Sequence, residues 1–304
     1  MRKATGCGTL VLFLLCAGIG LVFGKQIGFY LDLYRVHRMA QSFYAEYEHI
    51  ARNVTFDPLL DPRLDVYSPA TGTHNPVVVF VHGGSWKDYD KVLFAPVAFK
   101  LLPEEFVVVI PDYTLHPDAG YEQMAREVAA VLSWTLENIE AYGGDPEHVV
   151  IAGHSAGGHL LGLAVMDPRF LAATGHSSDE ICGLVSLSGV YDIQAEYDFW
   201  LAKGVEPKVI SEVMGGPENF AQASPISYVR AVLPPLLLIH GDEDKTVPDG
   251  ISTRFHRALQ TTGAQSELII YPGKGHSDYL VSALSQSNAP LVAQISNFVR
   301  SCGR

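Results

Sequence analysis

The chain has 304 residues, of which 48% are hydrophobic, and a formal net charge of -12 at pH 7. This length suits one large α/β domain with a short appendage and does not require a second core. Because association with phosphates needs a positive field, the charge argues against nucleic acid and other broad anionic surfaces as partners. We expect one domain that admits a small neutral or cationic ligand.

The N-terminal segment is apolar. Arg2 and Lys3 precede residues 6–24, which contain no charged residue. This run is near the length that spans a membrane, and no Ala-x-Ala-like site for signal cleavage follows it. We predict that residues 1–24 form an uncleaved single-pass membrane anchor. A cleaved signal peptide, with secretion of the remainder, is the alternative.

Residues 25–55 mix aromatic and charged side chains and are predicted to form a helical stalk that carries no catalytic residue. Basic residues flank the apolar run on both sides, so the positive-inside rule leaves the orientation open. The sequon at Asn53 would be glycosylated only if the domain were luminal or extracellular.

The remaining residues, 56–304, are predicted to form the α/β domain, because short apolar runs alternate with helical patterns and imply a mostly parallel sheet covered on both faces. The expected strands are 64–67, 77–81, 106–110, 149–152, 184–187, 236–239 and 268–271, and the expected helices are 121–142, 247–262 and 279–299.

His82-Gly83-Gly84-Ser85-Trp86 follows the strand 77–81. Its glycines let the backbone approach closely, so the amides of Gly83 and Gly84 are candidates, with that of Ala156, for an oxyanion hole. Trp86 either lines a substrate pocket or caps the core.

Gly153-His154-Ser155-Ala156-Gly157 lies between the strand 149–152 and an apolar helix. This is the Gly-x-Ser-x-Gly elbow in its strand-turn-helix context, where a strained serine points out of the sheet and only glycines fit beside it. Ser155 is therefore the candidate nucleophile.

Residues 191–232 form an irregular insertion rich in aromatic residues, Gly and Pro. We interpret it as a small cap over the site, with a helical excursion at the sheet edge as the alternative.

Three carboxylates, Asp242, Glu243 and Asp244, follow the strand 236–239. We choose Asp244 as the acid, because the first two are more easily explained as turn or capping groups. His276 follows the last strand on a glycine-flanked loop and is the candidate base, so the chain order is Ser, Asp, His. These residues need no cofactor, and no pair of histidines has metal-ligand spacing.

Four cysteines are too few for a disulfide scaffold, and two of them, Cys7 and Cys16, fall in the apolar run. Cys302 is predicted to be a free thiol at a frayed terminus. The redox compartment stays open.

The motifs together resemble the esterase/lipase-like α/β-hydrolases with His-Gly-Gly-x-Trp, the BD-FAE-like group, and within it the isoprenylcysteine alpha-carbonyl methylesterases. The resemblance covers nearly everything from residue 63 onward. It rests on the loops that carry Ser155, Asp244 and His276 and on five segments: Arg63-Leu64-Asp65-Val66-Tyr67, Ile110-Pro111-Asp112-Tyr113, Ala141-Tyr142-Gly143-Gly144-Asp145-Pro146, Ser224-Pro225 in the cap and Gly273-Lys274-Gly275-His276-Ser277-Asp278.

The resemblance implies a serine carboxylesterase acting on the methyl ester of a prenylated C-terminal cysteine, held at an endoplasmic reticulum or Golgi membrane by its N-terminus. The motifs are shared with arylformamidases, which open N-formylkynurenine, and with small-ester or deacetylating carboxylesterases, so these remain alternatives. A noncatalytic binding module is a further alternative, disfavoured by the complete set of Ser155, Asp244 and His276. The oligomeric state is not indicated.

Overall fold

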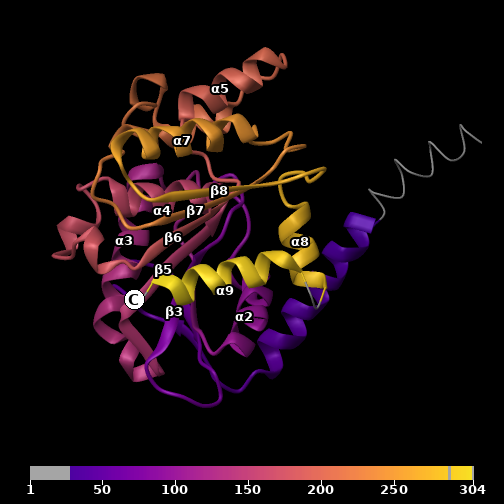
Figure 1. The fold of residues 1–304 in the computed structure, drawn as a ribbon, viewed down its shortest axis with the longest axis vertical. Coiled ribbons are helices and arrows are strands. Elements are labelled where there is room, and N and C mark those ends of the chain that lie inside the picture. The colour runs from indigo at the N-terminus through magenta and orange to yellow at the C-terminus, as the bar shows by residue number, and fades with distance from the viewer. Residues whose placement is uncertain (1–27, 287–288, 303–304) are drawn as a thin grey trace, which may run out of the picture.

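A computed structural model describes residues 28–286 and 289–302 of the protein. Its centre is an eight-stranded sheet in the order β1-β2-β4-β3-β5-β6-β7-β8 (Figure 1). β1 and β2 are antiparallel to their neighbours, and all other pairs are parallel. The strands are β1 Ile50–Val54, β2 Leu64–Tyr67, β3 Asn75–Val81, β4 Val107–Pro111, β5 Gly144–His154, β6 Gly183–Leu187, β7 Leu236–Gly241 and β8 Ser266–Tyr271. The predicted α/β class is confirmed.

The central strands are uninterrupted apolar runs because helices cover both of their faces. In β3, every residue from Val77 to Val81 is at most 1% exposed. The register places Val78 beside Val150 of β5 and Val108 of β4. β-Branched side chains suit this packed, pleated surface, which explains why these strands were visible in the sequence.

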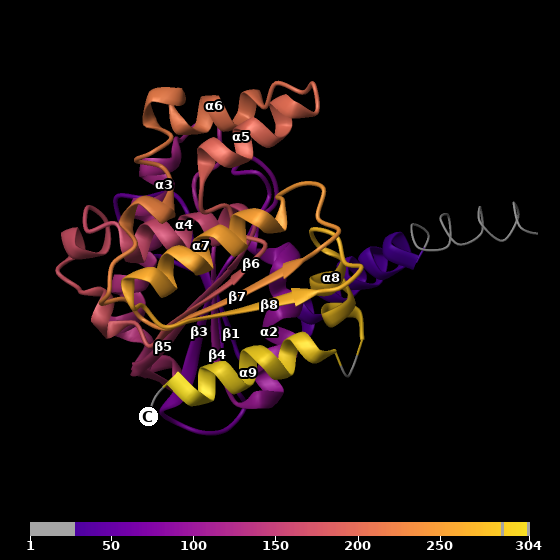
Figure 2. The ribbon, with the colours of Figure 1, turned by 45° about the horizontal axis from the view of Figure 1, so that its top comes forward.

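Two helical layers enclose the sheet (Figures 1 and 2). One layer contains α3 Tyr121–Asn138, α4 Ala156–Met166 and α7 Asp249–Thr262. The other contains a helix at residues 28–46, α2 Ala95–Leu101, α8 Asp278–Ser285 and α9 Pro290–Cys302. The single helix predicted for 279–299 is thus two helices, and Pro290 begins the second. Proline suits the first turn of a helix but not its interior.

Residues 28–55, the described part of the predicted stalk, differ from that prediction. The helix 28–46 packs against the domain, where Val36 is 4% and Ala40 1% exposed. Residues 50–54 are not helical but form β1, the edge strand of the sheet. An apolar stripe in the sequence indicates that a helix has a buried face. It does not indicate which surface of the protein covers that face.

The insertion at 191–232 contains α5 Ile193–Ala202 and α6 Lys208–Met214, which stand above the sheet in Figure 2. Trp200 and Ile210 from these helices line a cavity together with Ser155. This placement supports the cap interpretation over a helical excursion at the sheet edge.

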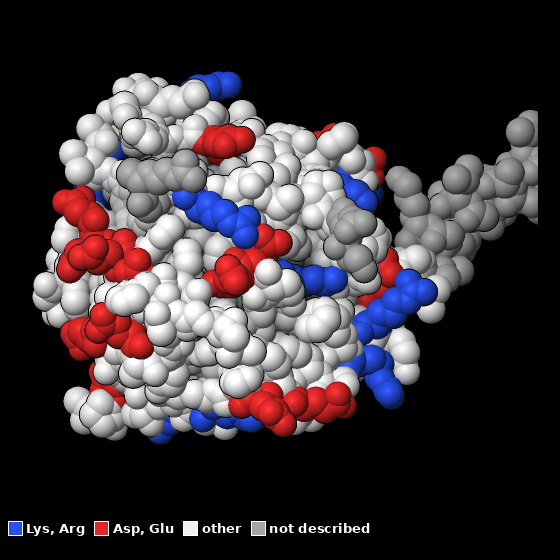
Figure 3. All heavy atoms as spheres, turned by 60° about the horizontal axis from the view of Figure 1, so that its bottom comes forward, with Lys and Arg blue, Asp and Glu red and all other residues white. Residues whose placement is uncertain are grey.

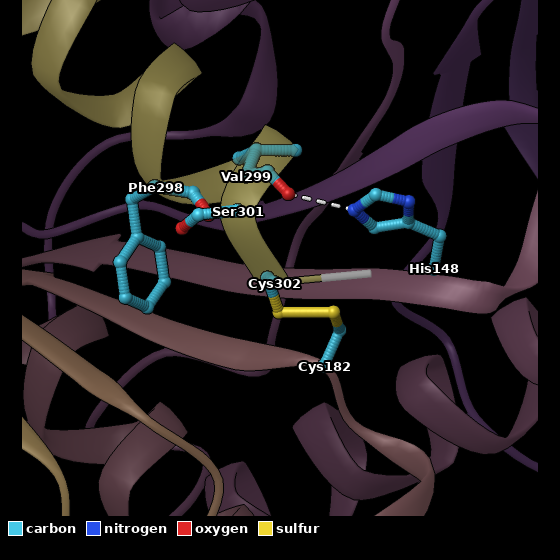
Figure 4. The surroundings of a disulfide bond; sticks show 6 residues. All are labelled: His148, Cys182, Phe298, Val299, Ser301 and Cys302. Carbon is cyan, nitrogen blue, oxygen red and sulfur yellow. Dashed lines mark hydrogen bonds between the residues drawn. A yellow bond between two sulfur atoms is a disulfide. The ribbon is translucent and has the colours of Figure 1, made fainter. Parts of the chain in front are cut away.

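The prediction of a free Cys302 is wrong. Cys302, at the end of α9, forms a disulfide with Cys182, which directly precedes β6 (Figure 4). The packing of α9 on the sheet brings the two together: Val299 is fully buried, and its carbonyl accepts a hydrogen bond of 2.7 Å from Nε2 of His148. Because the cysteines are 120 positions apart in the sequence, they become neighbours only through the fold.

The predicted anchor at 1–24 lies outside the described residues. Among the helices that the structure describes, none combines the length and apolar character needed to cross a membrane.

Candidate active site

Ser155 lies at the sharp turn between β5 and α4. Its φ of 55° and ψ of -119° are strained for a residue with a Cβ. Its amide donates to the carbonyl of Leu187 at 2.8 Å, which fixes the turn to β6. The side chain is therefore held at the carboxyl end of the sheet.

Gly157 makes this turn possible. A Cβ at Gly157 would lie 2.1 Å from the carbonyl oxygen of Val81, so no larger residue fits while α4 packs against β3. This is the steric reason for the second glycine of the elbow.

His276 connects Ser155 to Asp244. Nε2 of His276 accepts from the Ser155 hydroxyl at 2.8 Å, and Nδ1 donates to Oδ2 of Asp244 at 2.7 Å. His276 is on the loop after β8, which is braced by a hydrogen bond from the amide of Gly275 to Oδ2 of Asp278 at 2.8 Å. The structure thus brings together the three residues selected from the sequence.

Asp244 is held as a carboxylate by further donors besides His276. Its Oδ1 accepts from the amides of Thr246 and Val247, at 2.8 and 2.9 Å, and its Oδ2 accepts from His240 at 3.0 Å. Burial alone would raise the pKa of Asp244, but hydrogen bonds from His240 and His276 outweigh it and hold this pKa well below its ordinary value. Asp244 therefore stays ionised at neutral pH.

Asp242, one of the carboxylates weighed against Asp244, has a structural contact. Its Oδ1 accepts from the amide of Gly273 at 2.6 Å and so ties the acid loop to the loop that carries His276. His240 has a similar supporting position, since its Nδ1 lies 2.6 Å from the hydroxyl of Ser252.

His154 and His159, which flank Ser155, are buried and neutral. Burial and the neighbouring His276 lower the pKa of His154 to about 3, and its Nε2 donates to the carbonyl of His276 at 3.0 Å. Burial lowers the pKa of His159 to about 4. Both fit the packing role expected from the sequence.

Trp86 satisfies both interpretations that the sequence left open. Its side chain is only 4% exposed, and its Nε1 donates to Nδ1 of His159 at 3.1 Å. It also lines a cavity with Ser155.

Gly83 and Gly84, two of the predicted oxyanion-hole residues, line the same cavity as Ser155, and Ala156 directly follows Ser155. Gly83 packs against Ser155, and Ala156 is the first residue of α4, so its N–H has no acceptor within that helix. Gly84 has a φ of 126°, and a Cβ there would lie 2.0 Å from the carbonyl oxygen of Asp88. These three amides remain the predicted oxyanion hole.

His82 orients one of these amides, a role that sequence reasoning missed. Nδ1 of the buried His82 ring donates to the carbonyl of Gly83 at 2.7 Å. Because C=O and N–H point in opposite directions across a trans peptide, this bond turns the N–H of Gly84 away from His82. The ring is itself held between Tyr113 and Phe94, with centroids 4.5 and 5.6 Å away.

Two cavities meet at Ser155. The smaller, about 270 Å³, lies under the cap and is lined by Trp86, Trp200 and Val209. The larger, about 640 Å³, shares Ser85, Ser155 and Thr246 with it and is mainly apolar. Its walls include His276 and residues of the helix 28–46, which the sequence had assigned to a stalk without catalytic residues.

The smaller cavity also contains a buried acid that was not predicted. Glu196 is 3% exposed; its Oε1 accepts from Nε1 of Trp200 at 2.8 Å, and its Oε2 has no hydrogen-bond partner among the described residues. Burial raises the pKa of Glu196 to about 8. Across the described residues, no group of three or more His, Cys, Asp or Glu side chains is placed to hold a metal ion.

Comparison with known proteins agrees with this geometry. The BD-FAE family model matches residues 64–259. An isoprenylcysteine alpha-carbonyl methylesterase of Arabidopsis thaliana is 30% identical over 76% of this chain and 57% of its own length, and the esterase LipQ of Mycobacterium tuberculosis is 32% identical over 64% and 48%. The chain thus spans about half the length of these curated relatives.

Among solved structures, a butyrate-bound esterase of Thermogutta terrifontis superimposes with a TM-score of 0.69, at 21% identity, over 83% of this chain and 94% of that one. At this level of identity the likeness concerns the fold, which is the α/β-hydrolase fold expected from the motifs. With the family match extending over most of the sheet and across Ser155 and Asp244, the chain belongs to the BD-FAE family of α/β-hydrolases.

Proposed function

We propose that this protein is a serine carboxylesterase that hydrolyses the methyl ester of a prenylated C-terminal cysteine. The main support for this reaction class is a continuous chain of hydrogen bonds. It runs from Oγ of Ser155 to Nε2 of His276, at 2.8 Å, and from Nδ1 of His276 to Oδ2 of Asp244, at 2.7 Å. A serine hydroxyl is a weak nucleophile unless a base removes its proton, and here the base is already in contact with it.

The steps follow from these contacts. As Oγ of Ser155 attacks the ester carbon, Nε2 of His276 takes the hydroxyl proton, and Asp244 stabilises the imidazolium through Nδ1. The carbonyl oxygen gains negative charge beside the amides of Gly84 and Ala156. Collapse of this intermediate breaks the bond to the alcohol oxygen, which leaves with the proton from His276.

Water then releases the acyl group. His276 takes a proton from the water as it attacks the acyl-enzyme carbon, and the bond to Oγ of Ser155 breaks with return of that proton. Acid and free enzyme result, and the side chains described supply every proton transfer in this sequence.

Two features support the prenylcysteine ester as substrate. The relatives that match over three quarters of this chain include methylesterases of isoprenylcysteine, and the mainly apolar 640 Å³ cavity beside Ser155 is of the size of pockets that enclose whole ligands. Methanol, the alcohol released, needs little space.

We further propose that residues 1–24 anchor the enzyme to the membrane that holds its lipidated substrate, in the endoplasmic reticulum or Golgi. On the face shown in Figure 3, several basic side chains lie on the side of the helix 28–46, and acidic ones gather at the opposite edge. Arg35 and Arg38 of this helix are exposed. Basic side chains near an apolar segment suit an anionic membrane surface. Fractionation of cells expressing the full chain tests the anchor: release by salt alone would contradict it.

The test of function is hydrolysis of p-nitrophenyl acetate, farnesylcysteine methyl ester and N-formylkynurenine by the wild type and by Ser155→Ala. We expect the farnesylcysteine ester to be preferred and the substitution to lower kcat by about 10⁴-fold or more. Preference for N-formylkynurenine would make the protein a formamidase. Turnover that does not depend on Ser155 would refute the esterase mechanism.

A further inference from the structure

The helix at residues 28–46 presents an apolar stripe toward the catalytic serine. Phe29, Leu33 and Val36 from this helix line the larger cavity, which also contains Ser155 and His276. In both views of the fold, the helix (indigo) lies beside α8 (yellow), whose Leu280 and Leu284 form part of the facing wall (Figures 1 and 2). One wall of the cavity thus comes from a segment upstream of the family match at 64–259.

The helix is firmly attached to the domain. Val36 and Ala40 are buried in the interface, and the ring of Phe43 stacks on that of Tyr67 in β2, with centroids 5.8 Å apart. Just after the helix, the hydroxyl of Tyr47 donates to the carbonyl of Ser68 at 2.6 Å. A wall fixed at one end in this way can act as part of a preformed pocket.

Several large apolar side chains at this cavity remain exposed to solvent in the folded protein. Tyr30, Tyr34 and Tyr89 are 67%, 61% and 59% exposed, and all three line the larger cavity. Contiguous exposed apolar surface around a cavity is typical of a binding site. Among the described residues, the cavity is lined by three histidines but by no Asp, Glu, Lys or Arg side chain.

We propose that the helix 28–46 is the specificity wall of the larger cavity and that it binds the long apolar chain on the acyl side of the ester. This inference rests on the proposed function, in which the acyl group carries the lipid and the alcohol is small. The occupant is an extended hydrocarbon chain, since the lining offers apolar contacts along its length and no charged partner.

The chain length of the acyl group provides the test. The full-length enzyme is assayed with monomeric p-nitrophenyl acetate, butyrate, octanoate and decanoate. Each methylene buried in the cavity is expected to raise kcat/KM by up to about fourfold, so kcat/KM rises from acetate to decanoate. A flat profile in the wild type would overturn the inference.

Leu33→Trp, which narrows the cavity, should lower the ratio of kcat/KM for decanoate to that for acetate at least tenfold. The matched control is Leu31→Trp: Leu31 is on the same helix, 52% exposed, and not part of the cavity lining, so the ratio should keep its wild-type value. Tyr34→Ala is a second variant for the case that Leu33→Trp does not fold, because Tyr34 is exposed and its replacement should not disturb folding. It should lower the same ratio about threefold.

Equal ratios in wild type, Leu33→Trp and Tyr34→Ala would show that the helix does not contact the acyl chain. If the variants instead change turnover of long n-alkyl acetates, the cavity binds the alcohol side, which contradicts the assignment. If both tryptophan variants alter only hydrolysis of substrates in vesicles, the helix contacts membrane rather than substrate. Absence of Ser155-dependent acetate hydrolysis refutes the proposed function itself, so the two failures are distinguishable.

Discussion

The two cavities that meet at Ser155 are built by different parts of the chain. The smaller one is lined by residues between Ser85 and Val247, all within the segment matched by the family model. The larger one takes part of its wall from the helix 28–46 and from α8, which lie outside that segment. The family match therefore covers Ser155, Asp244 and the cap side, whereas His276 and part of the wall of the wider, apolar cavity come from segments outside the match.

The chemical character of the cavities differs as well. The cap side combines tryptophans with the buried acid Glu196, and the helix side is mainly apolar. We expect the first to select the leaving group and the second the acyl chain, with one shared catalytic centre. Substitutions can test the shared centre, the buried acid and the leaving-group assignment in turn.

The largest effect is expected from Asp244→Asn. An amide at this position cannot hold His276 in the tautomer that accepts from Ser155, so kcat should fall by about 10⁴-fold. Because the centre is shared, p-nitrophenyl acetate and decanoate should lose the same factor. The control is Asp242→Asn, which keeps an oxygen for the amide of Gly273 and should cost less than about tenfold. A larger loss in the control would move the acid role to Asp242.

Glu196→Gln tests the buried acid through the pH dependence of stability. The folded protein keeps the Glu196 proton up to a pKa of about 8, whereas the unfolded chain releases it near 4.5. The folded state thus binds more protons between these values, and its contribution to the free energy of unfolding falls as pH rises from 4.5 to 8. In the Glu196→Gln variant this fall should be smaller by about 2–4 kcal/mol between about pH 5 and pH 8.

Urea denaturation at pH 5 and pH 8 measures this difference. The matched control is Glu206→Gln, an exposed carboxylate on the cap between α5 and α6, which should follow the wild type at both pH values. Parallel behaviour of Glu196→Gln and wild type would mean that Glu196 is already ionised in the folded protein.

The smallest effect is expected in the smaller cavity. Val209→Trp should lower kcat/KM for p-nitrophenyl octanoate about tenfold relative to methyl octanoate, because only the first has a bulky leaving group. Lys208→Trp, at an exposed neighbour that does not line the cavity, should leave this ratio at its wild-type value. A loss that depends on acyl length instead would reverse the assignment of the two cavities.

Sequence reasoning was strongest where local rules determine structure. The elbow at Ser155 needs a strand, a strained turn and small neighbours, all of which are visible in a few consecutive residues. The order of Asp244 and His276 after it follows from the topology of the sheet, so the hydrogen-bond chain could be anticipated. The central strands were also predictable, because both of their faces are buried and their sequences are continuous apolar runs.

The errors occurred where distant segments meet. The apolar stripe containing Phe29, Leu33 and Val36 predicts a helix, but its partner surface is assembled from α8 and the loops around Ser155. In the same way, nothing local marks Cys182 and Cys302 as partners. Glu196 does not belong to any motif that sequence reasoning identified, and its burial depends on how the cap folds over the sheet.

The disulfide has a mechanical consequence. It closes a covalent ring that contains Asp244 and His276 but not Ser155. A force applied to the C-terminus, as by an unfolding motor that grips the tail, reaches the sheet through sulfur at Cys182, beside β6. The strands β7 and β8 and the loops that carry the acid and the base are bypassed by this load until β6 itself is extracted. The oxidised chain should therefore resist stepwise unfolding from its C-terminus. In the reduced chain, α9 should unfold before β8, and β8 before β7.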